Sequence, residues 1–318
     1  MQFYDIFNGD ADGICALQQL RLEEPRASVL VTGVKRDVHL LDRVNAAAGD
    51  ELTVLDVSLK TNAGDVKRLL AAGARLRYFD HHEAGEIPRD PKLKAFIDIA
   101  ADICTSLIVD RFLGGRQRLW AVVAAFGDNL PGPALRAAQG LDLDERDVAR
   151  LRALGECMNY NAYGETVEDL HYHPADLFET VSHYQDPRQF LDGEPVLEVL
   201  KNALADDVAR AAGIKPQMAG GNAAIYVLPG AAWSRRIHGF YGNQLALKHP
   251  RRAHALLVSG HGGYLVSVRA PTENPRGADV LCRQFEGGGG RQAAAGINWL
   301  PEADYPRFAA ELAKAFPG

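Results

Sequence analysis

The sequence has few cysteines, no long apolar run and no surplus of positive charge. Its four cysteines stand far apart without C-x-x-C spacing, which disfavours disulfides and a structural zinc and favours buried reduced thiols. The longest apolar runs, such as 119–126, are far shorter than the ~20 residues that a membrane-spanning helix needs. Residues 1–5 show no basic region leading into an apolar stretch. We therefore expect a cytoplasmic protein with no membrane span and no signal peptide.

The charge balance limits the class of partner. A net charge of −6 argues against a broad electrostatic track for long nucleic acid, which normally needs a basic face. It leaves room for a short anionic substrate held by metal ions and a few arginines. The oligomeric state, monomer or homodimer, stays open.

The first part of the chain is expected to alternate strands and helices. Strand-like runs lie at 3–7, 28–32, 52–57 and 75–79. A helix is expected at 62–72, with Asn62 as its N-cap and Gly73 as its stop. Such a βαβα order predicts an α/β fold whose N-terminal parallel sheet is flanked by helices.

The rest of the chain predicts a connector and a second domain. Helices are expected at 141–160, with Asp142 or Asp144 as candidate caps, at 195–212 and near 239–248. Strands are expected at 223–228, 255–259 and 264–269. With 318 residues, two domains fit comfortably. We expect a catalytic domain at 1–190, a helical connector at 191–215, and a smaller C-terminal α/β domain with a mixed sheet at 216–318.

Carboxylates and imidazoles follow the predicted strands of the first domain. Asp10 and Asp12 come after the first strand, Asp56 ends a later one, and the run Asp80-His81-His82 ends another. Because ligands bind beyond the carboxyl ends of the strands in parallel sheets, these side chains are expected on one rim. An isolated D-x-D pair is more often a turn or helix cap, but three such elements together favour a site.

This set of side chains suits a hydrolytic centre with two divalent ions. Carboxylates favour manganese and magnesium, and an added imidazole shifts the preference toward manganese. Asp10 and Asp12 can each bind one ion, Asp56 can bridge the two, and His81 offers a nitrogen. A hydroxide activated by the two ions would be the nucleophile, and His82 would protonate or orient a phosphate.

The run from Asn8 to Gly13, with Asp56 and Asp80-His81-His82, resembles motifs one to three of the DHH phosphoesterase superfamily. The family's fourth motif is an aspartate after an apolar helix, and Asp128 matches it in position. The resemblance implies that Asp10 and Asp56 hold the first ion. It assigns the second ion to a further set: Asp12, Asp56, His81 and Asp128. Many family members have histidine where this chain has Asn8, and an asparagine oxygen is a weaker ligand, which leaves the first ion's affinity open.

A second resemblance covers the C-terminal part of the chain. The run 288–296, GGGRQAAAG, is similar to the GGGHxxAAG signature of the DHH-associated C-terminal domain, with Arg291 in place of histidine. Ser267-Val268-Arg269 is similar to the strand that carries a phosphate-binding arginine there. The resemblance implies that substrate is bound by Arg269, by the backbone of Gly288, Gly289 and Gly290, and by Arg291.

Together these features predict a metal-dependent phosphodiesterase that cleaves short oligonucleotides or dinucleotides to nucleoside monophosphates. His82 and Asp80 are the expected catalytic residues. Three alternatives remain open. One is a pyrophosphatase or polyphosphatase, which the C-terminal signature disfavours. Another is an exonuclease for long single strands, which would need extra domains and a basic channel. The third is a non-catalytic nucleotide sensor in which Asn8 has disabled the first metal site.

Overall fold

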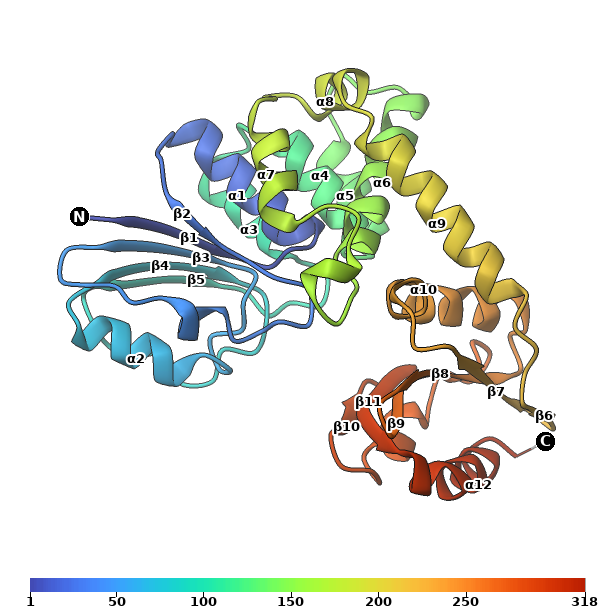
Figure 1. The fold of residues 1–318 in the computed structure, drawn as a ribbon. Coiled ribbons are helices and arrows are strands. Elements are labelled where there is room, and N and C mark those ends of the chain that lie inside the picture. The colour runs from blue at the N-terminus through green and yellow to red at the C-terminus, as the bar shows by residue number, and fades with distance from the viewer. Residues whose placement is uncertain (318) are drawn as a thin grey trace. The chain divides into compact units, whose positions relative to one another are not determined.

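The structure is a computed structural model that describes residues 1–317, and it divides into two compact units, Met1–Lys201 and Asn202–Gly318 (Figure 1). The predicted α/β fold is confirmed, with a parallel sheet in the first unit and a mixed sheet in the second. Among residues 1–317, no helix is both long enough and apolar enough to cross a membrane.

The first unit is built on five parallel strands in the order β2-β1-β3-β4-β5. The strands are β1 (Phe3–Phe7), β2 (Val29–Val31), β3 (Glu51–Leu55), β4 (Arg75–Asp80) and β5 (Leu93–Ile97). The helices of this part are α1 (Ala11–Glu23), α2 (Ala63–Ala71), α3 (Thr105–Phe112), α4 (Arg118–Gly127), α5 (Pro131–Ala138), α6 (Glu145–Asn161), α7 (Pro174–Ser182) and α8 (Pro187–Gly193). The edge strand β5 was not predicted.

Alternating side chains of the strands build a core on each face of this sheet. Phe7, Leu55 and Phe79 lie in register and pack with the helices α1, α3 and α4. The preceding row, Ile6, Val54 and Tyr78, packs on the other face with α2 and the 3₁₀ turn at Leu40–Arg43. This alternation follows from the two-residue period of a strand, and Figure 1 shows α1 and α2 on opposite faces.

Two predicted details of the helices differ in the structure. Asn62 precedes α2 as predicted, but its amide donates to the carbonyl oxygens of Val38 and Ser58, and its side chain accepts no capping bond. The helix predicted near 239–248 is longer and begins at Ala232. In α6 the candidate Asp144 is the cap, because its carboxylate accepts from the backbone N–H of Asp147.

The second unit carries six strands in the order β10-β11-β9-β8-β7-β6, of which only β7 and β8 pair in parallel. The strands are β6 (Met218–Gly220), β7 (Ala223–Leu228), β8 (Ala253–Gly260), β9 (Gly263–Arg269), β10 (Gly288–Gly290) and β11 (Ala294–Pro301). The helices are α9 (Val196–Ala212), in which the division between the units falls, α10 (Ala232–Lys248), α11 (Ala278–Cys282) and α12 (Tyr305–Ala315). One apolar cluster lies against α11 and α12, and another against α10.

Candidate metal centre

The strand register places the polar side chains of the site at one edge of the sheet. Because Phe7, Leu55 and Phe79 are in register, Asn8, Asp56 and Asp80 come next at the same edge. Asn8 N–H donates to the carbonyl oxygen of Leu55 at 3.2 Å, and Asp56 N–H donates to that of Phe79 at 3.0 Å. The ladder thus continues one residue beyond the strands and brings the three polar residues together, as parallel sheets do at their carboxyl ends.

Asp56 has a backbone conformation that is rare for its residue type. Its φ is +58°, and among residues 1–317 the only other non-glycine residue with positive φ is Asn129, at +59°. Asp56 is itself an expected ligand, and Asn129 directly follows another, Asp128. Asp and Asn tolerate this left-handed region best, and such strain gathers at functional sites.

The loop between β1 and α1 orients Asp10 and depends on two glycines. Asp10 is the N-cap of α1, because its Oδ1 accepts from the backbone N–H of Asp12 at 2.9 Å and of Gly13 at 3.1 Å. A Cβ at Gly9 would lie 2.1 Å from the carbonyl oxygen of Gly33, and one at Gly13 would lie 2.1 Å from that of Asn8. Only glycine fits at both positions.

Asp12 is held by the N-terminus of α3. Its Oδ2 accepts from the backbone N–H of Thr105, and its Oδ1 from that of Ser106, both at 2.7 Å. The Thr105 hydroxyl also donates to Asp56 Oδ1 at 3.2 Å. The start of a helix favours a carboxylate electrostatically, so Asp12 stays in place with lone pairs left for a cation.

His81 is prepared as a nitrogen ligand. Its Nδ1 lies 3.0 Å from the carbonyl oxygen of Ile103 and donates to it, so Nε2 carries the lone pair in the neutral ring. Nε2 lies 3.3 Å from Asp56 Oδ1 and 4.0 Å from Asp128 Oδ2. Burial lowers the pKa of His81, but the facing carboxylates outweigh it and raise the pKa to about 10. The position therefore attracts a positive charge.

Asp128 ends α4 at its C-cap, where the sequence placed it. One of its carboxylate oxygens lies within 4.8 Å of a carboxylate oxygen of Asp12 and a ring nitrogen of His81. A second group, whose ligand atoms also lie within 4.8 Å of one another, consists of Asp56, His81 and His82. Burial and the charges of Asp12 and Asp10 raise the pKa of Asp128 to about 6, although Lys35 opposes them. Burial and the same two carboxylates also raise the pKa of Asp56 well above its ordinary value. A bound cation would therefore stabilise the charged form of both carboxylates.

Asp80 lies behind this cluster and orients His82. Its Oδ1 accepts from His82 Nδ1 at 2.7 Å and from the backbone N–H groups of His81 at 2.9 Å and His82 at 3.2 Å. Asp80 is completely buried, whereas the His82 side chain is 47% exposed. The part of the His82 ring that does not contact Asp80 is thus exposed to solvent beside the cluster.

Lys35, which the sequence analysis missed, enters the site from the segment after β2. Its Nζ lies 2.5 Å from Asp10 Oδ2, 2.9 Å from Asn159 Oδ1 and 3.6 Å from Asp128 Oδ1. Burial alone raises the pKa of Asp10, but Lys35 and the N–H groups of the α1 N-terminus lower it below its ordinary value. Asp10 therefore differs from Asp56 and Asp128 because its charge is already balanced.

The expected substrate-binding residues all belong to the second unit. Arg269, at the end of β9, donates from Nε to Asn243 Oδ1 at 2.5 Å and from Nη1 to Ser267 Oγ at 2.9 Å, which orients the guanidinium. Gly288, Gly289 and Gly290 form the edge strand β10 and pair with β11. The glycine run is thus a strand rather than an open loop. Arg291 begins the turn to β11 and is exposed.

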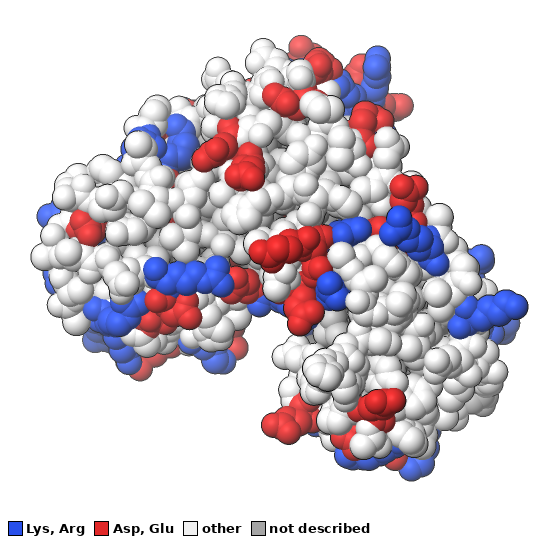
Figure 2. Space-filling model, in the orientation of Figure 1, with Lys and Arg blue, Asp and Glu red and all other residues white. Residues whose placement is uncertain are grey.

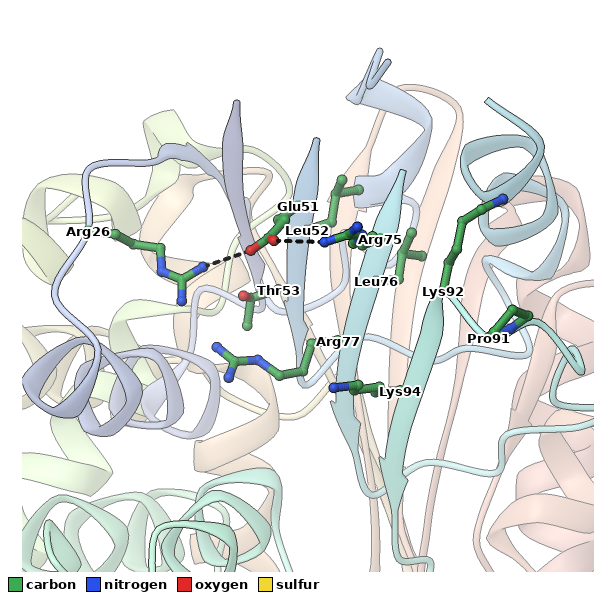
Figure 3. A pocket seen from close by; sticks show the side chains of 10 residues that line it. All are labelled: Arg26, Glu51, Leu52, Thr53, Arg75, Leu76, Arg77, Pro91, Lys92 and Lys94. Atoms are coloured by element: carbon green, nitrogen blue, oxygen red, sulfur yellow. Dashed lines mark hydrogen bonds and ion pairs between the residues drawn. The ribbon is translucent and has the colours of Figure 1, made fainter. Parts of the chain in front are cut away.

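A cavity of about 530 Å³ lies away from this cluster, at the amino ends of β3, β4 and β5. Its lining includes Arg26, Glu51, Arg75, Arg77 and Lys94 (Figure 3). The drawn ion pairs join Glu51 to Arg26 and Arg75. The cavity lacks the grouped carboxylates and imidazoles of the opposite edge, so the opposite edge is the better candidate for hydrolytic chemistry.

Solved structures with a similar fold were found, whereas no family model and no curated protein sequence matches the chain. A manganese-bound exonuclease RecJ is 16% identical with a TM-score of 0.61, over 100% of this chain and 90% of its own. The pGpG-specific phosphodiesterase PggH from Vibrio cholerae is 13% identical with a TM-score of 0.54, over 99% of both chains. An exopolyphosphatase-related protein from Bacteroides fragilis is 14% identical with a TM-score of 0.51, over 99% of this chain and 93% of its own. These likenesses confirm the DHH-type fold that the sequence resemblance implied.

Proposed function

We propose that this chain is a divalent-metal-dependent phosphoesterase that hydrolyses short oligonucleotides or dinucleotides to nucleoside monophosphates. The observation that carries the proposal is the gathering of Asp12, Asp56, His81 and Asp128 at one sheet edge. His81 belongs to two ligand groups there, one with Asp12 and Asp128 and one with Asp56 and His82. In this proposal, residues 1–190 supply the catalytic part, 191–215 connect, and 216–318 bind substrate.

The residues present fit a divalent ion. Three carboxylates suit a hard cation, and the single imidazole favours manganese over magnesium. The pKa values of Asp56 and Asp128 are raised by burial and by the neighbouring carboxylates. A divalent ion would offset that repulsion. When bound, the metal supplies a Lewis acid and makes water a nucleophile near neutral pH. Solved RecJ structures hold manganese or magnesium, which supports a divalent ion here.

His82 acts on the leaving group in this scheme. The bond from Nδ1 to Asp80 Oδ1 fixes the plane of the ring, as buried carboxylates do for catalytic histidines. The protonated Nε2 then donates to the leaving oxygen of the substrate. Asp80 is a positioning residue, because it is completely buried and acts through His82.

Two observations favour a short substrate. PggH, whose name states that it cleaves the dinucleotide pGpG, is similar over nearly the whole length of both chains. On the face in view in Figure 2, Lys and Arg side chains alternate with Asp and Glu, and they form no continuous basic track. We propose that Arg269, the β10 glycines and Arg291 bind the phosphate or base of such a substrate.

The test is hydrolysis of pGpG, other dinucleotides, longer oligomers and pyrophosphate with manganese, followed by chromatography of the products. We expect dinucleotides to be cleaved fastest. Asp56→Ala should lose more than about 100-fold in kcat/KM, beyond the usual effect of residues that only orient a metal ligand. The control is Asp192→Ala, which removes an exposed carboxylate. Tight nucleotide binding by the wild type without turnover would favour the sensor alternative and overturn the proposal.

A further inference from the structure

The Lys35 ammonium lies in a position that resembles a cation site. Three oxygens from different segments surround Nζ: Asp10 Oδ2 at 2.5 Å, Asn159 Oδ1 at 2.9 Å and Asp128 Oδ1 at 3.6 Å. The backbone of Lys35 is anchored as well, since its N–H donates to the carbonyl oxygen of Ala162 at 2.9 Å. Carboxylate and amide oxygens are the ligands that hard divalent cations prefer.

The residues expected at the first ion are already used by protein donors. Asp10 Oδ1 accepts two N–H groups at the start of α1, and Oδ2 accepts from Lys35. The Asn8 side chain bonds within the same loop, because Oδ1 accepts from Asp10 N–H and Nδ2 donates to the Lys35 carbonyl. Accordingly, Asp10 belongs to neither of the two ligand groups that His, Cys, Asp and Glu side chains form among the described residues.

Asp128 lies between the ammonium and the proposed metal ligands. Its Oδ1 faces Lys35 Nζ at 3.6 Å, and its Oδ2 faces His81 Nε2 at 4.0 Å. A carboxylate in this position can serve one cation with each oxygen. The arrangement therefore has two neighbouring cation positions, and a lysine of this chain fills one of them.

We infer that the Lys35 ammonium replaces one of the two metal ions that the sequence predicts, so that the chain binds a single divalent ion. The ion belongs to Asp12, Asp56, His81 and Asp128. This inference rests on the proposed function, since it requires that a metal binds there. Lys35 contributes a permanent positive charge beside the reaction centre, while Asp10 orients the ammonium and caps α1.

The inference is tested by counting manganese ions bound to the full chain. Metal-free protein is saturated with Mn²⁺ in equilibrium dialysis, and the metal is measured by mass spectrometry. We expect one equivalent for the wild type and two for Lys35→Ala, in which Asp10, Asp128 and Asn159 can hold the second ion. Lys35→Arg, which keeps the charge, should bind one. Lys314→Ala is the control, because it removes a lysine paired with a single carboxylate far along the chain.

Electron paramagnetic resonance of the saturated samples gives a second readout, independent of activity. The wild type should show isolated Mn²⁺, and Lys35→Ala should show two coupled ions. Two equivalents with a coupled spectrum in the wild type overturn the inference while leaving the proposed function intact. One equivalent in a folded Lys35→Ala variant overturns it too. A wild type that binds no manganese refutes the proposed function itself, and the wild-type count decides the matter even if the variants do not fold.

Discussion

The contact between Asp80 and His82 predicts a specific loss of activity. In Asp80→Asn the amide oxygen can still accept from His82 Nδ1, but the bond is no longer charge-assisted. Hydrogen bonds to charged groups contribute about 1.5–3 kcal/mol, against about 0.5–1.5 for neutral pairs, so the midpoints differ by roughly 1.3 kcal/mol. If Asp80 holds the His82 ring in its donating orientation through this bond, kcat should fall about tenfold, with the manganese content unchanged.

The new amide group also affects stability. Asp80 Oδ2 has no hydrogen-bond partner among the described residues, and an NH₂ group in its place would be a buried donor without an acceptor. Such a group costs about 1–3 kcal/mol, so Asp80→Asn should unfold at lower urea concentration than the wild type. Circular dichroism at the assay temperature must therefore confirm that the variant is folded before its kcat is compared.

A double-mutant cycle separates an effect through His82 from a general one. His82→Ala removes the ring that Asp80 orients, and in that background Asp80→Asn should change kcat by less than about twofold. The measurement is steady-state hydrolysis of a dinucleotide by the wild type, both single variants and the double variant. If the two losses multiply, Asp80 does not act through His82, and the assigned role is wrong.

Two further predictions concern stability. Asp5→Ala leaves Arg21 buried without its bidentate partner and should destabilise the protein by about 3–5 kcal/mol in urea unfolding. Asp65→Ala breaks an exposed ion pair and should cost under about 1 kcal/mol. Equal losses of stability in the two variants would refute this prediction. His254 is completely buried, and burial lowers its pKa from 6.5 to about 4, so the unfolded chain takes up a proton first and stability falls as the pH drops from about 6.5 toward 4. Between pH 7.5 and 5 the wild type should lose about 2 kcal/mol more than His254→Leu, and parallel losses would contradict the assignment.

The meeting of polar residues at one edge of the first sheet was predictable, because it follows from the register of the parallel strands. A short apolar strand followed by a polar residue occurs at Asn8, Asp56 and Asp80, and parallel pairing aligns such strand ends. The helices α6 and α9 followed from apolar periodicity, and Asp144 caps α6 as one of its two candidates. The sequence did not predict α5, α7, α8, α11 or α12. The sequence could therefore predict which side chains meet at this edge, although their roles are proposals.

The features of the site that the sequence did not predict depend on contacts between distant segments, which no local sequence pattern reports. Lys35 follows a three-residue strand and reaches Asn159, which is 124 positions away. Thr105 and Ser106 are recognisable in sequence as the start of a helix, but the bonds from their N–H groups to the distant Asp12 are not. Gly288–Gly290 was expected to bind substrate through its backbone, and its pairing with β11 as an edge strand depends on a segment that the glycine run itself does not report.

The convergence of Asp12, Asp56, His81 and Asp128 has a consequence for handling the protein. The four residues come from separate stretches of the first 128 positions and meet only when the unit is folded, so a metal that binds them binds the native state and not the unfolded chain. By linkage, free metal at 100 times its dissociation constant adds about 2.7 kcal/mol of stability. A chelating purification buffer would remove that contribution and leave buried carboxylates to repel one another. The melting temperature of the purified protein is then a property of its buffer as much as of its sequence.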